Sequence, residues 1–154
     1  MGNATKDMKN SAAPNPARAI SKRILVAEDN KAIRDIVSWI LDFMGFEVAL
    51  AENGAEALAL FIDSSFDLVL TDLEMPIMDG WSLTHLIKER SPRTPVVWMT
   101  GADREAVFKK VERGPVDSVL FKPFKVEDFQ STVRGALAFR EAGNESVNVA
   151  KGGY

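Results

Sequence analysis

The sequence predicts an α/β domain with a doubly wound, five-stranded parallel sheet in the order 2-1-3-4-5 and five helices. The first observation is that short apolar segments alternate with amphipathic segments five times along the chain. Such alternation is typical of a parallel sheet that helices cover on both faces. The second observation is the length, because 154 residues are too few for an eight-fold barrel of parallel strands, which needs about 250 residues.

The expected strands are short apolar runs at 24–27, 46–51, 67–72, 95–100 and 116–121. The first helix is expected over 31–44, where apolar residues recur with helical spacing, and it ends at Gly45, a usual residue after a helix. The residues of this helix that are expected to face the core are Ile33, Ile36, Val37, Ile40, Leu41 and Met44. Trp39 falls off this set, so we expect it to be partly exposed.

The turn at Asn53-Gly54 starts a second helix, whose expected inward residues are Ala57, Leu58, Phe61 and Ile62. Three further helices are expected over 81–90, 103–113 and 126–141. The last of them is expected to bury Val126, Phe129, Val133, Ala136 and Leu137, with Phe139 at the edge of the stripe.

One domain over 22–141 accounts for all five units. Residues 1–21 are polar, contain Pro14 and Pro16, and show no periodicity, so they are expected to form a flexible leader. Residues 142–154 are expected to form a flexible tail.

Composition excludes several classes of function. The net charge is −3 and no long basic run occurs, which argues against direct binding of nucleic acid. The chain has no cysteine, so disulfides, thiol catalysis and thiolate metal sites are excluded. No apolar run approaches the roughly 18 residues of a membrane span, and the N-terminus lacks the apolar segment of a signal peptide. A cytoplasmic protein without a membrane partner is expected.

Polar groups stand at the carboxyl ends of four expected strands: Glu28-Asp29, Asp72, Thr100 and Lys122. In a parallel sheet these ends share one edge. In the order 2-1-3-4-5 the first and third strands are neighbours at the point where the order reverses, which is where such sheets bind ligands. The sequence therefore predicts one site that combines three carboxylates, a hydroxyl and an ammonium.

Three carboxylates at short range repel one another and need compensating positive charge. Lys122 supplies one charge, and Mg²⁺, which prefers oxygen ligands, would supply two more. Glu28 and Asp29 are the expected metal ligands. Asp72 is the candidate nucleophile for a phosphoryl group, and Thr100 and Lys122 would hold the other phosphoryl oxygens.

The core resembles the receiver domain of two-component response regulators, a flavodoxin-like fold, in a stand-alone, single-domain form. The segments that carry the resemblance are LVAEDN, DLVLTDLEMPIMDG, VVWMTG and VLFKPF. The resemblance implies that Asp72 accepts a phosphoryl group from a phosphohistidine of a sensor histidine kinase or a histidine phosphotransfer protein. It also implies that Mg²⁺, or Mn²⁺ in its place, binds Glu28, Asp29, Asp72 and the backbone carbonyl of Glu74. The only reactions implied are self-phosphorylation and slow autodephosphorylation.

The expected output switch departs from the family pattern. Val119 stands where the family usually has an aromatic ring that responds together with Thr100. Phe121 lies two positions further along the same strand face, so Thr100, Val119 and Phe121 form the expected switch. An output protein is expected to bind the face formed by residues 103–141, and a homodimer is the alternative association.

Two other functions fit parts of the sequence. An aspartyl-nucleophile phosphatase would need an acid two residues after its nucleophile, a place that Glu74 occupies, but such enzymes usually carry the nucleophile on their first strand. A phosphate sink or protein-binding module would need no output switching. His85 is the only histidine of the chain and is expected at the surface without a catalytic role.

Overall fold

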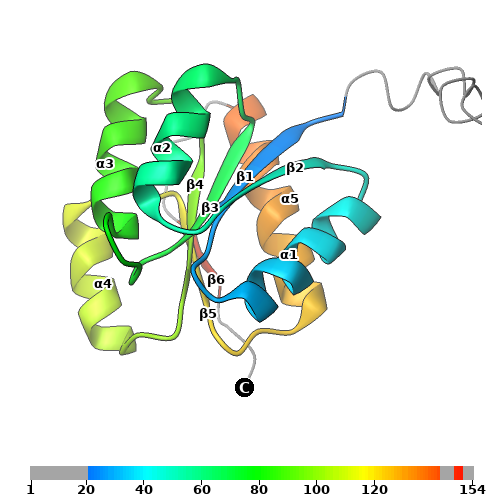
Figure 1. Ribbon diagram of the computed structural model, residues 1–154. Helices are drawn as coiled ribbons and strands as arrows, with labels where there is room; N and C mark the ends of the chain where they lie inside the picture. The colour runs from blue at the N-terminus through cyan, green and yellow to red at the C-terminus, as the bar shows by residue number, and fades with distance from the viewer. Residues whose placement is uncertain (1–20, 143–147, 151–154) are drawn as a thin grey trace, which may run out of the picture.

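The structure, a computed structural model, describes residues 21–142 and 148–150 (Figure 1). The strands are β1 Arg23–Ala27, β2 Glu47–Ala51, β3 Leu68–Asp72, β4 Val96–Thr100, β5 Ser118–Phe121 and β6 Asn148–Ala150. The helices are α1 Lys31–Phe43, α2 Gly54–Asp63, α3 Gly80–Arg90, α4 Arg104–Arg113 and α5 Val126–Ala142. The sheet has the order β2-β1-β3-β4-β5-β6, and every neighbouring pair is parallel. The predicted order of the first five strands is confirmed.

Helices cover both faces of the sheet, as the alternating pattern predicted (Figure 1). One apolar cluster joins α2, α3 and α4 to the sheet through residues such as Phe61, Leu83 and Val107. The opposite cluster joins α1 and α5 to the sheet through residues such as Leu41 and Phe129. Because both faces are covered, the central strands β3 and β4 are apolar almost throughout and nearly fully buried.

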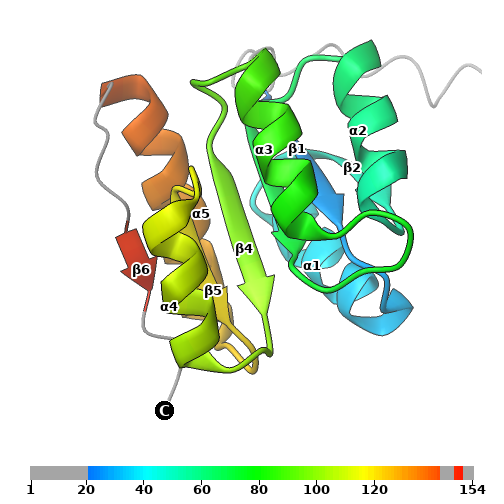
Figure 2. The same ribbon diagram turned by 90° about the vertical axis from the view of Figure 1, so that its left-hand side faces the viewer.

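The sixth strand was not predicted. β6 pairs with the outer edge of β5, with Ser118 opposite Asn148 and Leu120 opposite Ala150. Figure 2 shows it at the margin of the sheet, next to α4 and α5. Helix α5 acts as the crossover that returns the chain alongside β5, so β5, α5 and β6 form one more β–α–β unit. Three residues carry too short a pattern to be recognised as a strand, and the sequence suggested only a tail there.

Three residues expected in the core are exposed instead, namely Ile36, Ile62 and Val126. Each lies at the margin of its helix's apolar stripe, and a helix that rests on a flat sheet buries only the centre of that stripe. Trp39 is exposed, in line with its position off the predicted stripe. Within the described residues, no helix is long and apolar enough to cross a membrane.

Four helices begin with a side chain that accepts a hydrogen bond from a backbone amide three residues ahead: Asn30, Asn53, Asp79 and Asp103. Two of these caps lie next to the predicted site. Asn30 starts α1 directly after Glu28-Asp29, and Asp79 ends the loop that follows Asp72. Local capping therefore fixes where the chain leaves the carboxyl edge of the sheet.

Candidate functional site

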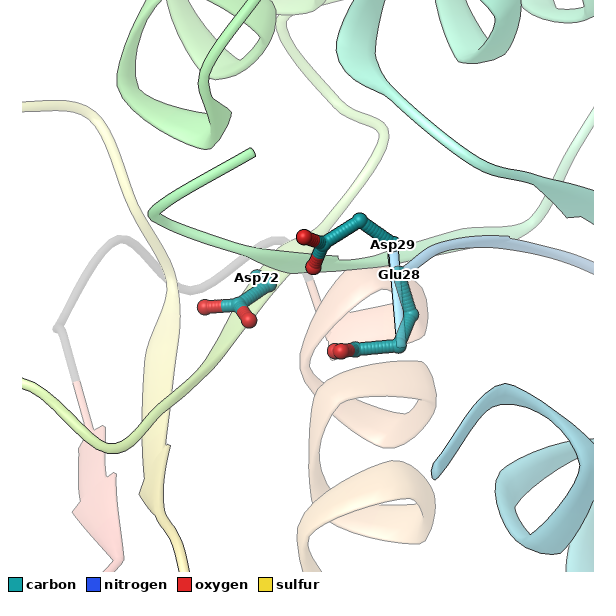
Figure 3. Close-up of side chains that lie close together, drawn as sticks. All are labelled: Glu28, Asp29 and Asp72. Atoms are coloured by element: carbon teal, nitrogen blue, oxygen red, sulfur yellow. The ribbon is translucent and has the colours of Figure 1, made fainter. Parts of the chain in front are cut away.

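Three acidic side chains converge at the carboxyl edge of the sheet. Glu28 and Asp29 follow β1 and Asp72 ends β3, which is the neighbour of β1. Figure 3 shows the three side chains close together, with the carboxyl groups of Glu28 and Asp29 directed toward Asp72. One oxygen of each lies within 4.8 Å of the others. Such a cluster needs positive charge close by, since like charges at this distance oppose ionisation.

Lys122 supplies that charge from the end of β5. Its ammonium Nζ lies 2.9 Å from Oε2 of Glu28 and 3.0 Å from Oδ2 of Asp72. Burial alone would lower the pKa of Lys122, but the hydrogen bonds and charges of the two carboxylates outweigh burial and raise this pKa above its ordinary value. Lys122, which follows β5, is therefore held in its charged form and connects the acids at the ends of β1 and β3.

Glu28 is the most buried of the three acids, with 1% of its surface exposed. Burial raises the pKa of its carboxyl, and the hydrogen bond and charge of Lys122 offset only part of this effect. Its other oxygen, Oε1, accepts a hydrogen bond from the amide of Asn30 at 3.3 Å. The cluster therefore sets three carboxylates against the single ammonium of Lys122, which bonds two of them, so its negative charge is not fully balanced.

Arg34 was missed by the sequence reasoning, although it holds the turn that carries two of the acids. This buried guanidinium donates to the backbone carbonyl of Glu28 at 2.8 Å and to that of Asp29 at 3.4 Å. Its other nitrogen, Nη2, lies 3.4 Å from Oε1 of Glu52. The sequence did contain a sign of this role, because Arg34 is a cation next to Ile33, among the apolar residues of α1. Such a residue is buried only where acceptors meet it.

Thr100 ends β4, the strand next to β3, and its side chain is almost fully buried. Its hydroxyl oxygen accepts a hydrogen bond from the amide of Ala102 at 3.0 Å, and its carbonyl accepts one from the amide of Lys122 at 2.8 Å. Thr100 is therefore attached both to the loop that leads into α4 and to the residue that bridges the acids.

The loop after Asp72 folds back tightly on the strand end. The amide of Glu74 lies 3.4 Å from Oδ1 of Asp72, so the Glu74 backbone is adjacent to this carboxylate. The amide of Gly80 donates to the carbonyl of Leu73 at 2.8 Å. A Cβ atom at Gly80 would lie 1.9 Å from the carbonyl oxygen of Asp72, so only glycine fits this approach.

Val119 and Phe121 lie in β5, in the apolar cluster on the side of α2, α3 and α4. Both are buried, and Phe121 packs edge-on against Phe108 of α4, with ring centroids 5.8 Å apart. The guanidinium of Arg104 lies 4.3 Å from the centre of the Phe121 ring. The Phe121 ring thus contacts two side chains of α4, whereas Val119 is a small buried residue of the apolar cluster.

His85 lies on α3, and its ring nitrogen Nδ1 is 3.0 Å from the carbonyl oxygen of Trp81. The ring is partly buried and also packs beside the indole of Trp81. These neighbours lie outside the group formed by Glu28, Asp29, Asp72 and Lys122, so the site contains no histidine.

Known proteins resemble this chain in sequence and in fold. Residues 24–134 match the family model of the response regulator receiver domain. The regulatory protein AtoC of Escherichia coli K12 is 36% identical over 124 residues, which cover 80% of this chain and 27% of AtoC. The response regulator receiver protein Anae109_2439 of Anaeromyxobacter sp. Fw109-5 is 36% identical over 105 residues, which cover 68% of this chain and 44% of that protein.

A CheY-like receiver domain from Methanospirillum hungatei JF-1 has a similar structure, with a TM-score of 0.74 and 30% identity over 80% of this chain and 99% of that chain. This chain spans 27% of the length of AtoC and 50% of that of the response regulator MprA of Mycobacterium sp. KMS, another curated relative. Since the family model covers most of the described residues and the acidic strand ends coincide with a receiver fold, the chain belongs to the response regulator receiver domain family of two-component systems.

Proposed function

We propose that this chain is a phosphoacceptor switch in which Asp72 takes a phosphoryl group from a phosphohistidine of a sensor histidine kinase or a phosphotransfer protein. The observation that carries the proposal is the convergence of Asp72 with Glu28, Asp29 and Lys122 at one strand edge. An oxygen of Asp72 attacks phosphorus, and the bond to the donor imidazole nitrogen breaks. The imidazole leaves with the electron pair and gains a proton from water, and an aspartyl phosphate remains.

The donor set suits a hard divalent cation such as Mg²⁺. Glu28, Asp29 and Asp72 offer only carboxylate oxygens, and these lie within 4.8 Å of one another. Burial raises the pKa of Glu28, and Lys122, whose ammonium also bonds Asp72, offsets this effect only in part. When bound, Mg²⁺ would neutralise charge on the phosphoryl oxygens. We assign its ligands to these three carboxylates and the backbone carbonyl of Glu74.

Lys122 and Thr100 have separate parts in the proposal. Lys122 already bonds Oδ2 of Asp72, so its ammonium is in place to bind an oxygen of the transferred group. Thr100 would turn its hydroxyl to a second phosphoryl oxygen and give up the hydrogen bond from Ala102. Because Ala102 belongs to the loop before α4, this exchange links the chemistry to the surface formed by α4, β5 and α5.

A small phosphodonor tests the proposal without a kinase. With acetyl phosphate and Mg²⁺, we expect intact mass spectrometry to show one added phosphoryl group per chain, and with EDTA in place of Mg²⁺ we expect none. Steady release of many phosphates per chain without an adduct would instead indicate a phosphatase. No adduct and no release would indicate a protein-binding module.

The surface formed by α4, β5 and α5 gives a second test of the proposed switch. With beryllofluoride, a phosphoryl mimic, we expect amide shifts in α4, β5 and α5, because Thr100 ends β4 just before the loop that leads into α4, and Lys122 directly follows β5. Phe121 should shift more than Val119, since Phe121 contacts Phe108 and Arg104 of α4. Comparison of amide spectra with and without beryllofluoride measures this. Shifts confined to the neighbours of Asp72 would mean that the site is not coupled to this face and that the protein acts as a phosphate sink.

A further inference from the structure

Helix α1 carries a second apolar stripe on its exposed side. Ala32, Ile36, Trp39 and Phe43, which we call the α1 stripe, are all exposed, at 55% for Ile36, 82% for Trp39 and 87% for Phe43. The opposite side of the same helix is buried through Val37 and Leu41. Single exposed apolar residues are common on protein surfaces, but a row of two aromatic rings and an isoleucine on one helix marks a contact surface.

The spacing within the α1 stripe identifies the shape of its partner. The four residues follow one another at intervals of four, three and four positions. This repeat produces the narrow seam through which one helix packs lengthwise against another. A shallow hollow lined by Asp35, Ile36, Ser38 and Trp39 lies beside the seam and offers room for a side chain of the opposing helix.

We propose that the α1 stripe is a homodimer interface, in which α1 of a second copy packs antiparallel against it. The charges at its ends favour this orientation, because Lys31, which pairs with Asp35 at 2.7 Å within one copy, stands at the start of α1 and Asp42 near its end. Antiparallel packing places each Lys31 near Asp42 of the other copy, whereas parallel packing sets like charges side by side. Antiparallel packing also places the large Phe43 side chain of one copy opposite the small Ala32 of the other.

The apolar area of the α1 stripe comes close to what such a contact needs. An aromatic side chain buries about 150–250 Å², so the four aromatic rings of two copies would remove roughly 500–900 Å² from water. Ile36 and the flanking polar residues add to this, and the total approaches the about 1,200–2,000 Å² of a specific interface. A dimer of this kind leaves α4 uncovered, since α4 lies on the opposite face of the sheet (Figure 1).

Sedimentation velocity of the full chain over a range of concentrations tests the proposal. We expect the unmodified protein to form a dimer whose population rises with concentration. Trp39→Glu should raise its dissociation constant at least about thirtyfold, as expected when a central aromatic residue of an interface is lost. Trp39 is exposed in the monomer, so circular dichroism should show an unchanged fold. The matched control is Ile62→Glu, which places the same charge at an exposed apolar residue of α2 and should leave the dissociation constant unchanged.

A charge exchange tests the orientation. Asp42→Lys alone should weaken the dimer, and Lys31→Glu combined with Asp42→Lys should restore it. A monomer at all concentrations would overturn the proposal, as would a dimer that tolerates Trp39→Glu. A third outcome would also overturn it. If the unmodified protein stays monomeric and Trp39→Glu slows phosphoryl transfer from a kinase, the α1 stripe binds the phosphodonor instead of a second copy.

Discussion

Asp72→Asn is expected to remove phosphorylation almost completely, with label uptake from acetyl phosphate lowered by more than about a hundredfold because an amide is not a nucleophile for phosphorus. The fold should survive and keep equal or higher thermal stability without metal. The variant relieves repulsion in a cluster of three carboxylates, while the side-chain amide oxygen that it introduces can still accept a hydrogen bond from Lys122. Mass spectrometry measures the uptake, and thermal unfolding followed by circular dichroism measures the stability.

Asp79→Asn is the matched control for this experiment. Asp79 lies in the same loop but caps α3, where its side chain accepts from the amide of Ser82 at 2.8 Å. Asparagine caps helices as well as aspartate, so uptake and stability should both be kept. Continued labelling of Asp72→Asn at the original rate would show that another residue accepts the phosphoryl group.

Gly80→Ala is expected to cost at least about 2–3 kcal/mol of unfolding free energy, in the range of severe overpacking. The added Cβ would stand 1.9 Å from the carbonyl oxygen of Asp72 and 3.0 Å from the Cα of Leu73. These obstacles are backbone atoms at the end of a central strand, so no side-chain rotation can relieve the clash. Unfolding in urea measures the loss.

Gly135→Ala makes the opposite change on α5. A Cβ at Gly135 meets no atom within 4 Å, and alanine is favoured over glycine inside a helix by about 1 kcal/mol. This control should therefore raise the urea midpoint. Equal midpoints for Gly80→Ala and the unmodified protein would mean that the loop after Asp72 can move away from β3.

Much of the fold could be predicted because the local signals agree with one another. Apolar runs, helical spacing and turns such as Asn53-Gly54 all pointed to the same five strand–helix units. The acidic site followed from topology alone, since parallel strands bring their carboxyl ends together and the groups at those ends are polar.

What remained unpredicted depends on contacts that only the folded chain makes. Arg34 is buried because the carbonyls of Glu28 and Asp29 meet it, and no sequence pattern shows where carbonyls point. Ile36 is exposed because the flat sheet reaches only part of its helix. β6 exists through pairing with β5, and its three residues carry no signal of their own.

The neighbouring indole rings of Trp81 and Trp98 provide an intrinsic fluorescence signal. Their centroids are 5.8 Å apart, and Trp98 is buried in β4, two residues before Thr100. The Trp98 Nε1–H donates to the Thr84 hydroxyl at 2.8 Å, which fixes the ring against α3. We expect the ultraviolet emission of this fixed pair to change with events at the adjacent strand end, and Trp39→Phe, which removes the exposed third indole, would isolate that signal in otherwise unlabelled protein.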